Sequence, residues 1–105
     1  MLVAAVALAP QPVLGAASEA ARDYDAARRQ FTDALQAYRA LGHRRGVVRQ
    51  LESLAWCASC ELRDEEAVRL AGGAAAIRLR IGTRAKPAER ERIDRTLTSA
   101  RTRLS

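Results

Sequence analysis

The sequence predicts an all-helical protein that is built as an array of helical hairpins. The chain has 105 residues, of which 49% are hydrophobic but only 4% aromatic. This composition, with much Ala, Leu and Val, suits closely packed helices better than sheets. Apolar residues recur at the three- and four-residue steps of amphipathic helices. Gly42 and Gly82 each end such a stretch and lie 40 positions apart (82 − 42 = 40). We therefore predict two helical units of about this length and a C-terminal capping helix.

The first predicted unit covers residues 12–42 and holds two helices. Pro12 suits the first turn of a short helix over residues 12–22. A longer helix over residues 25–41 follows, and Gly42 ends it as the residue just past the helix. Its apolar face comprises Ala27, Phe31, Ala34, Leu35, Tyr38 and Leu41.

Residues 1–11 form an apolar segment ahead of this unit. They are either the remnant of a preceding helix or an exported leader. No positively charged residue precedes the apolar run, which favours the helix. No run in the chain approaches the roughly 20 apolar residues of a membrane span, so we expect no membrane partner.

The second predicted unit covers residues 43–82, with helices over residues 44–62 and 64–81. Asp64 stands where it can cap the later helix. Residues 83–105 supply a basic loop and a final helix, for which Pro87 suits the first turn. A narrow apolar stripe on this helix would cover the second unit; it consists of Ile93, Leu97, Ala100 and Leu104.

Several of these residues carry a family resemblance. Leu14-Gly15, the run over residues 23–27, Phe31 and Ala34-Leu35 resemble the tetratricopeptide signature of Leu-Gly, Gly-Asp-Tyr-x-x-Ala, an aromatic residue and Ala-Leu. The second unit resembles it more loosely, at Leu54-Ala55, residues 64–67 and Ala74, with Ala71 where the aromatic residue would be.

A more specific likeness lies in residues 38–55, 67–82 and 86–90. They are similar to the last repeats of large multidomain transcriptional regulators of actinobacteria, which join an ATPase domain to a tetratricopeptide array and often to a LuxR-type helix-turn-helix. The chain has no Gly-x-x-x-x-Gly-Lys-Ser/Thr loop and no further helix-turn-helix unit. Neither nucleotide binding nor DNA binding is therefore carried over.

The resemblance implies a cytoplasmic protein-protein interaction or scaffold module, at the sensor or scaffold end of a larger signalling or transcriptional regulator. Its partner would be a protein or peptide. The tetratricopeptide pattern places the partner-binding groove at Glu19, Arg49, Glu52, Trp56 and Ser59. Trp56 either fills the space between helices or is exposed in that groove, where Trp and Arg concentrate binding energy. Because a stack of two units exposes its ends, a homo-oligomer is also expected.

An alternative function comes from charge. The chain carries 18 Lys and Arg against 12 Asp and Glu, a net charge of +6. These basic residues are mostly scattered among acidic ones, so nucleic acid is not the expected partner. One dense cluster, Arg44, Arg45 and Arg49 beside His43, supports the alternative of a DNA-linked regulatory fragment.

No set of residues points to catalysis, a cofactor or a metal. Cys57 and Cys60 have C-x-x-C spacing, but structural zinc needs four ligands and His43 is the only histidine. A redox pair is expected at a helix start after a strand, whereas these lie within a helical pattern. We expect packing cysteines, with a dimer-bridging metal or disulfide, or redox chemistry, as alternatives. A nucleophile, base and orienting carboxylate do not occur together, so no enzyme is predicted.

Overall fold

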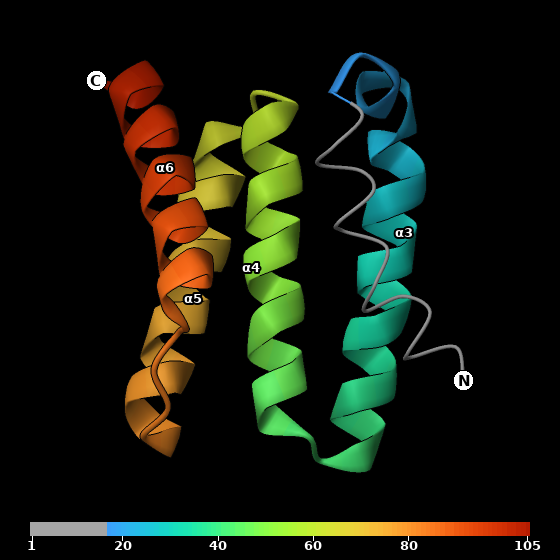
Figure 1. The fold of residues 1–105 in the computed structure, drawn as a ribbon, viewed down its shortest axis with the longest axis vertical. Coiled ribbons are helices and arrows are strands. Elements are labelled where there is room, and N and C mark those ends of the chain that lie inside the picture. Colours follow the sequence, from blue (N-terminus) through green and yellow to red (C-terminus); the bar gives the residue numbers. More distant parts are fainter. Residues whose placement is uncertain (1–16) are drawn as a thin grey trace.

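The computed structural model describes the backbone over residues 17–105 and the side chains from residue 23 onward. This part of the chain contains α3 (Ala17–Leu41), α4 (Arg44–Cys60), α5 (Asp64–Ile81) and α6 (Pro87–Leu104), and no strand (Figure 1). The all-α prediction is confirmed, and helices pair as hairpins. No helix in the described range is long and apolar enough to cross a membrane.

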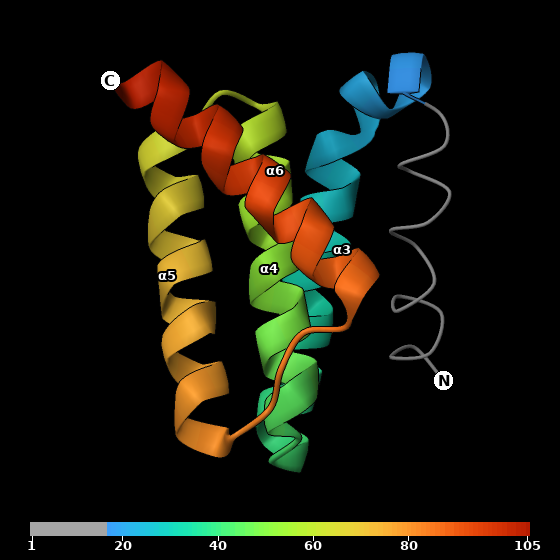
Figure 2. The same ribbon diagram turned by 60° about the vertical axis from the view of Figure 1, so that its left-hand side comes forward.

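Helix α4 is the central element of the array. It packs against α3 on one side and α5 on the other, and α6 crosses both α4 and α5 (Figures 1 and 2). Two clusters of buried residues hold the contacts. Ala27, Phe31 and Cys57 join α3 to α4, with Leu54 and Trp56 against them. Ala58, Ala67 and Ala100 join α4, α5 and α6, with Val68 against them.

The predicted boundary between two helices near residues 22–25 is wrong. Helix α3 runs without a break from Ala17 to Leu41. This stretch contains neither Gly nor Pro, the two residues that most often end a helix, so its local chemistry allows the helix to continue. The predictions for residues 1–16, including the helix start at Pro12, lie outside the described residues.

The turn from α3 to α4 depends on local chemistry. Gly42 adopts a left-handed conformation with φ of 69°, which costs glycine little. His43 caps α4, because its Nδ1 accepts a hydrogen bond from the Gly46 amide at 2.9 Å. The buried ring of Tyr38 lies over Gly46, where a side chain would collide with it. A glycine therefore lets the two helices approach closely.

The later helix ends agree closely with the predictions, but the predicted cap of α5 is wrong. Arg63 is the N-cap residue, and Asp64 is the first helical residue and makes no capping hydrogen bond. Helix α4 stops at Cys60, two residues early, because Leu62 takes a left-handed φ of 61°. Gly82 ends α5 with φ of 70°. Pro87 begins α6, whose first turn is held by the Lys86 amide bonding to Glu89 Oε1 at 3.1 Å.

Candidate partner-binding site

The structure places the expected groove residues of α4 in different environments, because α5 and α6 cover most of that face. Glu52 is buried and forms a two-point ion pair with Arg78 of α5, at 2.7 Å to Nε and 2.8 Å to Nη2. This hydrogen bond raises the pKa of Arg78, which stays charged. Glu52 thus joins two helices and is not free to bind a partner.

Two further groove residues also serve contacts within the protein. Ser59 is buried, and its carbonyl and hydroxyl oxygens both accept hydrogen bonds from Arg103 Nη2 of α6 at 3.0 Å. Trp56 is half-buried, and its ring meets that of Tyr24 edge-on, with centroids 5.6 Å apart. Trp56 therefore packs between α3 and α4, as in the core-filling alternative. The side chain of Glu19 lies outside the described residues.

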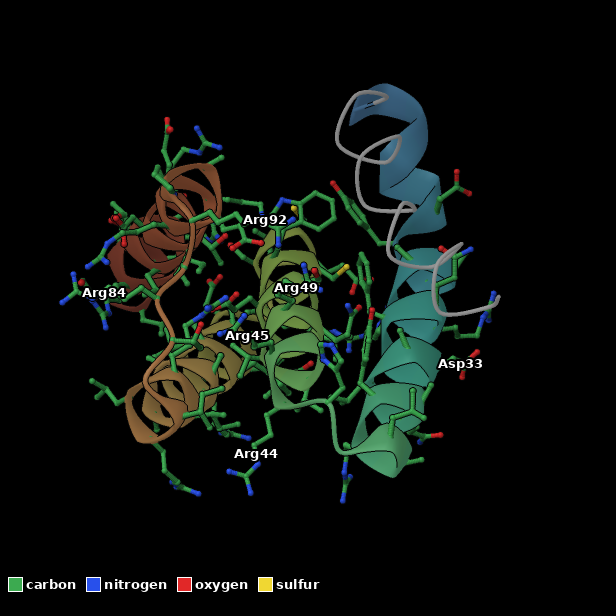
Figure 3. All side chains as sticks on the ribbon, turned by 60° about the horizontal axis from the view of Figure 1, so that its bottom comes forward. Asp33, Arg44, Arg45, Arg49, Arg84 and Arg92 are labelled. Carbon is green, nitrogen blue, oxygen red and sulfur yellow. The ribbon has the colours of Figure 1, made fainter. Side chains whose placement is uncertain are left out.

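Among the groove residues with described side chains, Arg49 is the one that remains exposed, and it lines a cavity of about 330 Å³. Helices α4 and α5 are antiparallel, so the beginning of α4 meets the end of α5 and the segment that leads to α6. Arg45 and Arg49 emerge from α4, and Arg84 from that connecting segment (Figure 3). We call this the basic cavity; its lining residues are His43, Arg45, Arg49, Arg78, Thr83, Arg84, Lys86 and Glu89.

The basic cavity carries uncompensated positive charge. Its carboxylate, Glu89, accepts the Lys86 amide and lies 3.9 Å from Arg78 Nη2. Within the described residues, no carboxylate forms an ion pair with the side chains of Arg45, Arg49, Arg84 or Lys86. A concave site lined by unpaired cations attracts an anionic group.

A second, larger cleft of about 740 Å³ adjoins the basic cavity. It lies between α5 and α6 and shares Arg78, Thr83 and Arg84 with the basic cavity. We call it the apolar cleft, after the walls formed by Ala71, Ala75, Leu79, Ala85, Ile93 and Leu97. The rest of its lining is polar, glycine or charged and consists of Glu52, Arg78, Gly82, Thr83, Arg84, Arg90 and Asp94. The two hollows together make one surface with an apolar part and a cationic part.

The cysteine pair lies elsewhere, near the end of α4. Cys57 is 1% exposed, whereas Cys60 is exposed, and both are free thiols. Burial, reinforced by Cys60 and Glu61, raises the pKa of Cys57 from 9.0 to about 12. Because the thiolate is the reactive form, Cys57 is a packing residue. In residues 23–105, no three His, Cys, Asp or Glu side chains gather as a metal site would require.

The sequence pointed to three of the eight residues that line the basic cavity, namely His43, Arg45 and Arg49. Arg45 and Arg49 belong to the cluster noted in the sequence, whereas Arg44 does not line the cavity. Arg84 and Lys86 were not expected there, since more than thirty residues separate them from Arg49. The 40-residue spacing of Gly42 and Gly82 was the available signal, because antiparallel hairpins bring the segments after these glycines to the same end of the array.

The comparisons with known proteins add no relative. No protein-family model, curated protein or solved structure matches the chain. The tetratricopeptide resemblance therefore stays a prediction, and a functional proposal depends on the geometry of the basic cavity and the apolar cleft.

Proposed function

We propose that the chain is a protein- or peptide-binding module of tetratricopeptide type, which works in the cytoplasm as the sensor or scaffold part of a larger regulator. The basic cavity is the observation that supports this proposal most directly. Cationic residues of helix α4 and of the segment between α5 and α6 line one concave site, whose local carboxylate is already engaged. The natural occupant is a partner surface that carries carboxylates. No catalytic role is assigned to the chain.

The neighbouring apolar cleft favours a protein partner over DNA. Duplex DNA is bound through a track of cations that follows its successive phosphates. Here the cationic residues line one cavity and do not form a track along the surface. Apolar walls next to the cations suit protein side chains, because burying apolar surface supplies most of the free energy of protein association.

A DNA-linked role remains the second candidate, favoured by the exposure of Arg44, Arg45 and Arg49 at the start of α4. A DNA-binding surface of this kind would show affinity that falls steeply with salt, because each neutralised phosphate releases counterions.

Fluorescence anisotropy with two labelled probes tests both candidates. One probe is a short Glu-rich peptide, and the other is duplex DNA. The wild-type chain is compared with the double variant Arg45→Glu/Arg49→Glu and with a control, Arg29→Glu/Arg69→Glu, which makes the same charge change at exposed sites outside the cavity. Circular dichroism checks that all three proteins fold.

We expect the peptide to bind the wild type and the control alike, and the cavity variant at least about tenfold more weakly, because two attractive charges become repulsive. Equal loss in both variants would show attraction by net charge alone and would contradict the proposal. The DNA-linked role would replace the proposed protein-binding role if the wild type bound DNA tightly, with a steep salt dependence, and only the cavity variant lost this binding.

A further inference from the structure

We propose that the surface binds an acidic segment that also carries an apolar side chain, with the apolar side chain in the apolar cleft and the carboxylates at the basic cavity. This inference rests on the proposed function and names the chemistry of the partner. It follows from the way the two hollows adjoin, since neither alone would select such a segment.

The apolar cleft forms because α5 and α6 diverge. Near the beginning of α5, Arg103 of α6 bonds to both carboxylate oxygens of Asp64 at 2.9 Å and holds the helices together. Toward the connecting segment the helices separate (Figure 2), and the cleft opens between them. Its volume of about 740 Å³ falls within the range of about 300–1,000 Å³ that is usual for ligand sites.

Short side chains line one wall of this cleft, and branched side chains line the other. Ala71 and Ala75 of α5 leave room that a longer side chain would take up, whereas Ile93 and Leu97 of α6 supply apolar contact area. Leu79 is 86% exposed beside them. A leucine-sized side chain inserted here would remove apolar surface of both partners from water.

The junction of the two hollows limits how far apart the binding groups can be. Arg78 lines both, but Glu52 holds its guanidinium at two points, so Arg78 acts as a fixed wall between them. Arg84 also lines both hollows and has no carboxylate partner among the described residues. Because the two hollows share lining residues, one short segment can place an apolar side chain in the cleft and carboxylates at the basic cavity.

Charge and apolar content distinguish the acidic segment from two other possible occupants, a second copy of the chain and nucleic acid. A second copy of the chain carries a net charge of +6 and would bring like charge to the basic cavity. Nucleic acid would supply anions but no aliphatic side chain for the cleft. An acidic segment with an apolar anchor complements both parts of the surface.

The test uses two synthetic peptides that have the same Glu residues, one with adjacent Leu residues and one with Ser in their place. The cleft is filled by Ala75→Phe, and its control is Ala76→Phe, since Ala76 is also exposed on α5 but does not line the cleft. Leu79→Ser provides a second cleft variant at an exposed position. Isothermal titration measures affinity, thermal unfolding verifies each fold, and light scattering gives the oligomeric state.

We expect the wild type and Ala76→Phe to bind the Leu peptide about tenfold or more tightly than the Ser peptide, as burial of leucine side chains implies. In Ala75→Phe this preference should disappear, and in Leu79→Ser it should shrink. Equal affinity of the wild type for both peptides would overturn the inference but leave the proposed function standing. Failure to bind either peptide would overturn both, and a dimer that only Ala75→Phe dissociates would assign the cleft to a second copy instead.

Discussion

Replacing Gly46 by alanine would place a methyl group against the ring of Tyr38, at the contact between α3 and α4. A Cβ atom at this position would lie 2.6 Å from Cε1 of the ring and closer still to Cδ1 and Cγ. Carbon atoms in favourable contact are about 3.5–4.0 Å apart. The ring is 7% exposed and lies against His43, with centroids 5.0 Å apart. The added methyl group would collide with ring atoms close to the Tyr38 backbone, which cannot move aside as the end of a flexible side chain can. The two helices must therefore move apart.

The magnitude follows from two opposing effects. Overpacking of a well-filled contact costs about 1–3 kcal/mol, and so deep an overlap belongs near the upper value. Alanine in place of glycine favours a helix by about 1 kcal/mol. We therefore expect Gly46→Ala to lower the free energy of unfolding by about 2 kcal/mol. The controls are Gly72→Ala and Gly73→Ala in α5, where no atom lies within 4 Å of the added Cβ. Each should raise the free energy of unfolding by up to about 1 kcal/mol.

Urea unfolding followed by far-ultraviolet circular dichroism measures these free energies. The double variant Gly46→Ala/Tyr38→Leu should recover part of the loss relative to the two single variants, since removing the ring removes the collision. If Gly46→Ala is as stable as the wild type, or more so, the close approach of α3 and α4 at this site is not what requires glycine.

Three further outcomes are expected. Arg78→Met should lower the free energy of unfolding by about 3 kcal/mol, because Glu52 is left buried without its partner; the control Arg95→Met removes an exposed pair and should cost under about 1 kcal/mol, so similar losses would contradict this. A thiol reagent should modify Cys60 in the folded protein and Cys57 only after urea unfolding; rapid reaction of both would refute the burial argument. Because the folded-state pKa of Cys57 is raised from 9.0 to about 12, the folded state holds its proton more tightly. Stability should therefore be lost as pH rises above about 9, by about 2 kcal/mol near pH 10.5, and less so in Cys57→Ala; equal pH dependence of the two proteins would contradict the assignment.

Helix ends with a local signal were predictable from the sequence. Gly42 and Gly82 take the left-handed conformation that ends a helix, and Pro87 begins one, so α5 and α6 have the predicted bounds. Near residues 22–25 the apolar spacing suggested a boundary, but the residues there are all compatible with a helix. The continuous α3 shows that local chemistry prevailed over the pattern.

The candidate site was less predictable, because it depends on which helix covers which. Glu52 and Ser59 lie on the same face of α4 as Arg49, and from the sequence all three could line one groove. Arg78 of α5 and Arg103 of α6 engage the first two in the folded protein and leave Arg49 open. No periodicity of a single helix reports how its neighbours cross it.

The sequence by itself determined that this protein is helical, where α5 and α6 begin and end, and that cations gather at the start of α4. Propensity, caps and apolar spacing are properties of residues a few positions apart, so they can be read along the chain. Tertiary structure alone decided that Arg84 joins Arg45 and Arg49 around one cavity, and that α5 and α6 part to leave an apolar cleft beside it. Both depend on contacts between helices that are distant in the sequence, and those contacts are set by the shapes and charges of whole faces.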